Sequence, residues 1–170
     1  YPVGDFLTWG AFTYPFAFLV TDLSNRRFGP AVARRVVYAG FAVAVVLSIA
    51  LATPRIALAS GTAFLAAQLL DVAVFDRLRA GAWWRAPLAS STVGSALDTA
   101  LFFWLAFSAS AAFVAPAEGW AIAPAPLLGV GPEAPFWVSL AVGDFLVKLA
   151  IAGLALGPYR AALSLLPARA

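Results

Sequence analysis

Residues 136–157 read FWVSLAVGDFLVKLAIAGLALG, a mostly apolar run that carries one acid, Asp144, and one base, Lys148. About 20 such residues cross the hydrocarbon core of a bilayer as a helix. A charged side chain at the centre of a membrane helix costs about 2.5–3.5 kcal/mol even on insertion scales, so it persists where it is paired or faces a polar interior. The run therefore predicts a membrane-spanning helix with one polar side.

The composition of the whole chain agrees with a membrane protein. Of 170 residues, 63% are hydrophobic and 11% are charged, whereas about a quarter of the residues of a soluble domain are charged. Cys and His are absent from the sequence, which excludes thiolate and imidazole metal sites, Ser-His and Cys-His nucleophiles and disulfides. We therefore expect an integral membrane protein that is not an enzyme and has no metal ion or cofactor.

Five segments are candidate membrane spans. They are the segment between Asp5 and Asp22, which contains Pro15, and residues 36–53, 56–75, 86–114 and 136–157. The first is short and is expected to be a broken or re-entrant helix, and the fourth is longer than one crossing and must tilt or emerge. The expected fold class is therefore an all-α integral membrane protein, with one transmembrane transporter domain over residues 1–170 and five spans.

The basic residues are unevenly distributed among the connections. Nine of the eleven lie in alternate connections or after the last span: Arg26, Arg27, Arg34, Arg35, Arg77, Arg79, Arg85, Arg160 and Arg169. The opposite connections contain Arg55 alone, with two acids in a Pro-rich stretch, residues 116–135. Cytoplasmic loops of membrane proteins are enriched in Lys and Arg, so we expect the arginine-rich side and the C-terminus to be cytoplasmic. The same pattern argues against a nucleic-acid partner, despite a net charge of +3.

Polar side chains recur on single faces of three of these spans. The sets with helical spacing are Gln68 with Asp71, Ser91 and Ser95 with Asp98 and the nearby Ser90, and Asp144 with Lys148. Asp144 and Lys148 suit a self-neutralising salt bridge, and Asp71 suits an ion pair with an arginine of residues 76–79. Asp98 has no cation within one turn, so it needs a partner from another helix or from a ligand.

The chemistry of this polar set suits a neutral heterocycle. A carboxylate accepts two N–H bonds, as from an amino-pyrimidinone edge, and a carboxamide both donates and accepts. An ion or proton path uses buried acids in the same way, so the residues alone leave both readings open.

Longer strings of the sequence resemble a known family. WGAFTYPFAFLVTDLSNRRFG at residues 9–29, with ARR at 33–35, is similar to the vitamin uptake transporters, whose best-known members are bacterial queuosine-precursor transporters. The similarity continues through QLLD at 68–71, VFDRLR at 74–79 and PLAS at 87–90, and on to Asp98, Asp144 and Lys148. It covers nearly the whole chain, which makes it more specific than a short motif.

The resemblance implies a six-helix protein of the bacterial inner membrane that imports a 7-deazapurine. The substrates that it implies are 7-cyano-7-deazaguanine, its 7-aminomethyl analogue or queuine, and one further helix is expected before residue 1. The predicted substrate-binding residues are Asp98, Asp71, Gln68, Asp144 and Lys148, followed by Asp22, Asn25 and Ser90, with Asp22 and Asn25 placed where the first span ends. Two departures stand out: many relatives have an acid and a Tyr in place of Arg26 and Phe28, and residues 116–135 have no recognisable counterpart.

Other functions remain open on the sequence alone. One is a substrate-binding subunit of a multi-component importer for a different vitamin, and another is an assembly subunit that carries no solute. A third is an intramembrane enzyme built on Asp71 and Asp98, which requires the two carboxyl groups to be in contact and to share a proton. Membrane lipid is an expected partner, and Gly153 and Gly157 suit packing within the bundle or across a homodimer.

Overall fold

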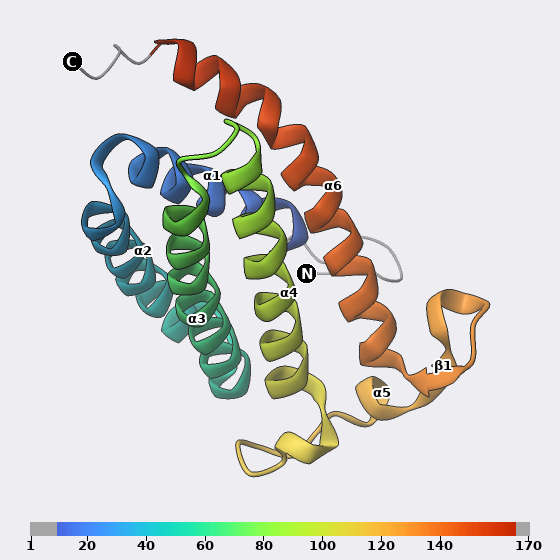
Figure 1. Ribbon diagram of the computed structural model, residues 1–170. Helices are drawn as coiled ribbons and strands as arrows, with labels where there is room; N and C mark the ends of the chain where they lie inside the picture. The colour runs from blue at the N-terminus through green and yellow to red at the C-terminus, as the bar shows by residue number, and fades with distance from the viewer. Residues whose placement is uncertain (1–9, 166–170) are drawn as a thin grey trace.

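The computed structural model describes the backbone of residues 10–165 and side chains from residue 15 onward, and this part of the chain is almost entirely helical (Figure 1). The helices are α1 (Gly10–Phe28), α2 (Pro30–Leu51), α3 (Pro54–Leu78), α4 (Arg85–Phe107), the single turn α5 (Gly119–Ile122) and α6 (Phe136–Leu165). Between α4 and α6 lie the 3₁₀ turns η1 (Ala109–Ala111) and η2 (Leu127–Gly129) and the strands β1 (Pro124–Pro126) and β2 (Glu133–Pro135). The two strands pair antiparallel as a small hairpin.

Four of the described helices, α2, α3, α4 and α6, are long and apolar enough to cross a membrane. An all-helical fold with four candidate membrane spans among the described residues is therefore confirmed. The remaining long helix, α1, has 19 residues and does not reach the same hydropathy. The crossing of the membrane by α1 stays a prediction.

The C-terminal end of the first span differs from the expectation. Its expected start, near Asp5, lies outside the described residues. Helix α1 does not end at Asp22 but continues through Asn25 to Phe28. Nor is the helix broken at Pro15, which lies within its second described turn. A proline removes one backbone hydrogen bond there, which membrane helices tolerate when neighbouring helices cover the site. Asp22 therefore lies inside the helix and not at its end, and Asn25, three residues further on the same face, lies in its last turn.

The fourth span is also shorter than expected, because α4 ends at Phe107 and not at Val114. Arg55, at the start of α3, accounts for this end. Its guanidinium donates to the carbonyl oxygens of Leu105 and Ser108 at 2.8 Å and of Ala115 at 2.6 Å. The last carbonyl groups of a helix have no partner within the helix, and Arg55 supplies a partner for one of these groups, at Leu105, and for two carbonyl groups of the chain that follows.

Replacing Arg55 by alanine is expected to destabilise the protein by about 2–3 kcal/mol, since hydrogen bonds from a charged donor to three carbonyl groups are lost. Thermal unfolding of the purified protein in detergent measures this, and limited proteolysis reports loosening of residues 108–135. Arg34→Ala is the matched control, because Arg34 is exposed. An Arg55→Ala protein that unfolds at the wild-type temperature contradicts the proposed capping role.

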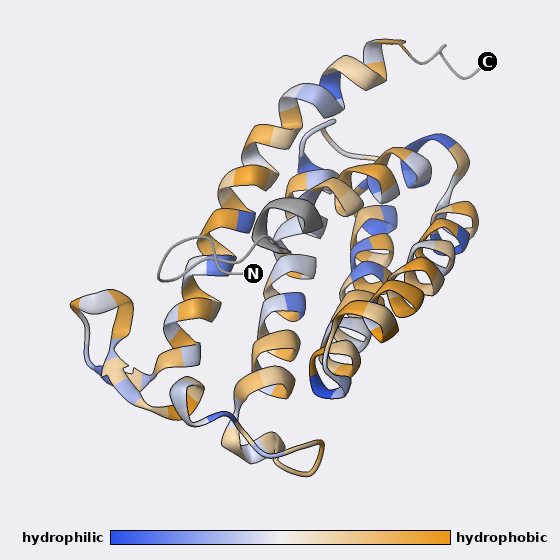
Figure 2. Ribbon diagram, turned by 180° about the vertical axis from the view of Figure 1, so that it is seen from behind, coloured by the Kyte–Doolittle hydropathy of each residue, from blue (hydrophilic) through white to orange (hydrophobic). Residues whose placement is uncertain are grey.

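The connections sort to two ends of the bundle. In Figure 1 the α1–α2 and α3–α4 connections lie at the same end as the last turns of α6, and the α2–α3 connection lies at the opposite end with the β-hairpin. Hydrophilic residues gather at the first end in Figure 2, as the distribution of arginine predicts. Arg160 lies inside α6 and not after it, and Arg169 lies outside the described residues.

Small residues bring α3 and α4 into close contact. Ala59, Ala63 and Ala67 are fully buried, and a Cβ atom added at Gly94 would lie 2.9 Å from the Phe18 ring and 3.4 Å from the Ala67 carbonyl oxygen. The α3 alanines and Gly94 therefore allow α3, α4 and α1 to approach closely. Gly153 and Gly157 are exposed on α6, with nothing described near their added Cβ atoms, so they do not pack within this bundle.

Candidate functional site

Most of the buried polar side chains form two groups inside the apolar bundle, and all eight predicted site residues belong to one or the other. The first group, the carboxyl-pair site, comprises Thr21, Asp22 and Asn25 of α1, Gln68 and Asp71 of α3, and Ser90 of α4. The second group, the salt-bridge network, comprises Asp98 and Thr99 of α4 with Asp144 and Lys148 of α6. The eight predicted residues are all 3% exposed or less.

Two carboxyl groups from different helices face each other in the carboxyl-pair site. Asp22 of α1 and Asp71 of α3 lie within hydrogen-bond reach of one another. The Ser90 hydroxyl oxygen is 3.2 Å from Asp22 Oδ1 and is placed to donate to it. Among the described residues, neither oxygen of Asp71 has a hydrogen-bond donor that meets ordinary geometric criteria.

Two carboxamides lie beside this pair with half of their hydrogen-bonding groups unused. Asn25 Nδ2 donates to the Val72 carbonyl oxygen at 3.0 Å, and Gln68 Oε1 lies 2.9 Å from the Thr21 hydroxyl oxygen. Asn25 Oδ1 and Gln68 Nε2 have no partner among the described residues. Most buried polar atoms in proteins are hydrogen-bonded, so unpartnered donors and acceptors gathered at one place indicate a site for a polar ligand.

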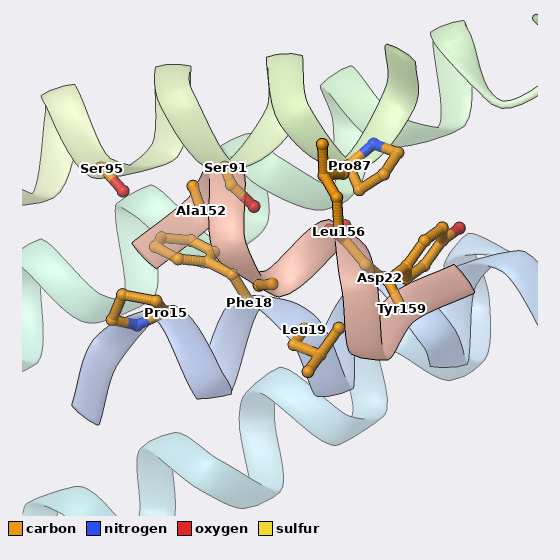
Figure 3. A pocket seen from close by; sticks show the side chains of 11 residues that line it. Pro15, Phe18, Leu19, Asp22, Pro87, Ser91, Ser95, Ala152, Leu156 and Tyr159 are labelled. Atoms are coloured by element: carbon orange, nitrogen blue, oxygen red, sulfur yellow. The ribbon is translucent and has the colours of Figure 1, made fainter. Parts of the chain in front are cut away.

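A small cavity of about 10 Å³ borders this site, between α1, α4 and α6 (Figure 3). Asp22, Ser91, Ser95 and Tyr159 contribute polar groups to its wall, and Phe18 is among its apolar residues. This volume accommodates about one water molecule. A planar bicyclic ligand does not fit, so the structure is closed at this point.

Arg26 lies between the carboxyl-pair site and the arginine-rich end of the bundle. Its Nε donates to the Tyr159 hydroxyl at 3.0 Å, its Nη1 donates to the Arg79 carbonyl oxygen, and its guanidinium lies 5.2 Å from the centre of the Phe75 ring. The sequence predicted a role in topology for Arg26, but it predicted no place beside this site for Arg26 or Tyr159. The only signal was that Arg26 departs from the acid of many relatives, one helical turn after Asp22.

The salt-bridge network joins α4 to α6 through Lys148. The Lys148 ammonium lies 2.7 Å from Asp98 Oδ2 and 2.6 Å from Asp144 Oδ2, and it donates to the Thr99 hydroxyl oxygen at 3.2 Å. Thr99 in turn donates to Asp144 Oδ2 at 2.7 Å. The predicted Asp144–Lys148 pair is confirmed. Asp98 was predicted to need a partner from another helix or from a ligand, and Lys148 of α6 is such a partner. Thr99 was missed as a network member, although it directly follows Asp98.

The two groups are separate. Ser90 and Asp98 are eight residues apart on α4, which corresponds to about 12 Å along the helix axis. The side chains that lie beside Asp71 include Asp22 and Ser90 but not Asp98. The contact between Asp71 and Asp98 that the enzyme alternative required is therefore absent among the described residues. The predicted ion pair of Asp71 with an arginine is also wrong, because Arg79 pairs with Asp76 at 3.4 Å.

Comparison with known proteins identifies relatives of the chain. Residues 8–52 and 47–162 match the family described as "Putative vitamin uptake transporter". The "Queuosine precursor transporter" of Escherichia coli (strain K12) is 40% identical over 126 residues, which cover 62% of this chain and 57% of that protein. The "Probable queuosine precursor transporter" of Haemophilus influenzae is 40% identical over 125 residues, 61% of this chain and 53% of that protein.

A third relative matches over more of its length. The "Probable queuosine precursor transporter" of Bacillus subtilis is 28% identical over 188 residues, 94% of this chain and 73% of that protein. The chain spans little more than half the length of the other two relatives. All three are described as transporters and not as enzymes. No solved structure matches the chain.

Proposed function

This chain belongs to the vitamin uptake transporter family, and from that premise we propose that it carries a queuosine precursor across a bacterial inner membrane. The observation that carries the proposal is the carboxyl-pair site: Asp71, Gln68 and Asn25 keep unpartnered polar atoms in the interior of a membrane protein. Its relatives described as queuosine precursor transporters supply the substrate class.

The hydrogen-bonding groups of the site complement a 7-deazaguanine such as 7-cyano-7-deazaguanine. The amino-pyrimidinone edge of such a base has two adjacent N–H donors and a neighbouring carbonyl acceptor. A carboxylate of the Asp22–Asp71 pair accepts two N–H bonds, and Gln68 and Asn25 extend the polar surface around it. Ser90 orients the pair through its bond to Asp22.

The salt-bridge network is the second part of the proposed path. Asp98, Asp144 and Lys148 lie nearer the middle of the membrane helices, and Asp98 Oδ1 is an acceptor without a partner among the described residues. We place a second substrate contact at this oxygen. Intramembrane ionisable residues commonly mark substrate pathways.

Transport requires the helices around the site to separate. The cavity of about 10 Å³ lies where α1, α4 and α6 meet, so the substrate enters when α1 or α6 moves away from α4. Helix α1 contains Pro15 and contacts α2, α3 and α6. A proline inside a helix marks a point where the helix can bend, which makes α1 the moving element in this proposal.

The topology that we propose follows from the arginine-rich end. If that end is cytoplasmic by the positive-inside rule, the C-terminus is cytoplasmic and α1 is the first of five spans in this chain. Gly153 and Gly157 form an outward-facing pair four residues apart, a spacing at which helices of two subunits approach closely. We propose this face for a homodimer.

The function is tested in a bacterium that lacks both precursor synthesis and its own importer. Cells that express the chain, or the full-length protein, receive nanomolar 7-cyano-7-deazaguanine, and queuosine in their tRNA is measured. We expect modified tRNA in these cells and unmodified tRNA in cells with the empty vector. Unmodified tRNA, with the protein shown to be in the membrane, contradicts the proposal and favours a substrate-binding subunit that needs a partner.

A further inference from the structure

We infer that the Asp22–Asp71 pair holds a single proton and that this proton is part of the surface that recognises the substrate. Uptake of the substrate is then linked to uptake of a proton. The inference rests on the proposed function, because the recognised group is the amino-pyrimidinone edge. It goes further in naming the proton as a second ligand of the same site.

The first step is the contact between two buried carboxyl groups. Asp22 and Asp71 are 1% and 0% exposed, and they lie within hydrogen-bond reach. Two carboxylates at such a distance away from water repel each other strongly, and one shared proton turns the repulsion into a hydrogen bond. Beside the pair, Gln68 Nε2 is also buried, has no hydrogen-bond partner among the described residues and lies on the same face of α3 as Asp71.

The charged and titratable groups around the pair come from three helices. Among the described side chains, α1 supplies Asp22 and Arg26, α3 supplies Asp71, and α6 supplies Tyr159, which borders the same cavity as Asp22. Helix α4 presents the neutral Ser90, and α2 packs with the apolar Ala33 and Val37 against Val72 of α3. Arg26 is near enough to Asp22 for an electrostatic interaction. Its guanidinium donates hydrogen bonds to the Tyr159 hydroxyl and the Arg79 carbonyl oxygen, so it does not lie between the two carboxyl groups.

The second step assigns the proton to Asp71. Asp22 Oδ1 lies 3.2 Å from the Ser90 hydroxyl oxygen, and a donated hydrogen bond stabilises a carboxylate. Asp71 accepts no bond that meets ordinary criteria from a described donor. The arrangement that satisfies both groups is therefore an Asp71 carboxylic acid that donates to the Asp22 carboxylate.

The third step concerns recognition. An ionised Asp22 accepts the two adjacent N–H groups of the substrate, and the Asp71 O–H donates to the neighbouring ring carbonyl. A doubly ionised pair lacks that donor and leaves the carbonyl unpaired, which a buried site penalises strongly. Each substrate molecule is thus bound together with one proton, and both are released when the site opens to the other side.

Infrared spectra of the purified protein without any ligand, compared between the wild type and single variants, test whether the pair holds a proton. We expect the C=O stretch of a protonated carboxyl group, shifted in D₂O, that is lost in Asp71→Asn and persists in Asp22→Asn. Asp98→Asn is the matched control, since Asp98 is equally buried but pairs with Lys148, and it should leave the band unchanged. Absence of the band from the wild type, or its loss in the Asp98→Asn protein alone, overturns the inference.

Calorimetric binding of 7-cyano-7-deazaguanine as a function of pH tests the coupling. The dissociation constant is expected to rise tenfold per pH unit above the pH at which the pair loses its proton, as linkage to one proton requires. In Asp71→Asn, whose amide donates without titrating, this dependence is expected to vanish. Binding of constant affinity across this range overturns the inference and leaves the proposed function intact, whereas the absence of binding at every pH contradicts the proposed function.

Discussion

Replacing Lys148 by methionine is expected to destabilise the protein by about 3–5 kcal/mol. Removal of one partner from a buried ion pair leaves an uncompensated charge, and here it leaves two carboxylates, Asp98 and Asp144, that both lie within 2.7 Å of the Lys148 ammonium. Methionine retains the length and the apolar stem of lysine, so packing loss is small. The measurement is the thermal unfolding temperature in detergent, which should fall by about 10 °C.

A compensated variant distinguishes lost charge balance from lost packing. In the triple variant Asp98→Asn, Asp144→Asn, Lys148→Met, no carboxylate remains to be neutralised, and replacing a buried ion cluster by neutral groups is often tolerated. We expect most of the lost stability to return. If the single Lys148→Met protein unfolds within about 2 °C of the wild type, the network does not hold α4 to α6.

The salt-bridge network shows how far sequence reasoning reaches. The spacing of Asp144 and Lys148 predicted their pairing, because residues four apart on a helix are neighbours. The same reasoning showed that Asp98 lacks a local cation. It did not identify Lys148 as the partner, since that choice depends on the rotation and the relative height of α4 and α6.

The pairing of Asp22 with Asp71 could not be predicted from local sequence patterns. The register of α3 against α4 opposes Gly94 to Ala67 and so brings Ser90 toward Asp71, whereas Asp98 falls one turn beyond Gly94. Asp22 joins them only because α1 continues past the point where its apolar stretch ends. Propensity and hydropathy do not encode that extension, because the helix is stabilised by packing against α2, α3 and α6.

The end of α4 is likewise determined by a tertiary contact and not by the local sequence. Residues 86–114 read as one apolar run, and nothing in that run predicts a stop at Phe107. The stop depends on Arg55, 50 residues earlier in the sequence than Leu105. The lone arginine on that side of the protein was visible in the sequence, but its role as a cap required the fold.

Replacing Asp71 by alanine is expected to reduce uptake of 7-cyano-7-deazaguanine about hundredfold. The variant removes the group that we propose to face the ring carbonyl, and an unpaired polar atom in a buried complex costs about 1–3 kcal/mol, where 1.4 kcal/mol corresponds to tenfold. The initial rate of uptake into cells of the strain described above measures this, with membrane levels of the protein matched by immunoblot.

The stability of the same variant makes the prediction specific to function. Apart from the proton shared with Asp22, Asp71 has no conventional hydrogen-bond partner among the described residues, so its removal loses little and also removes the cost of keeping a polar group in the apolar interior. We expect Asp71→Ala to unfold at the same temperature as the wild type or higher, in contrast to Lys148→Met. Residues whose loss abolishes activity and preserves or raises stability are those that a binding site retains at a cost to the fold. An Asp71→Ala protein that unfolds early and transports normally would assign the pair to structure and remove it from the substrate path.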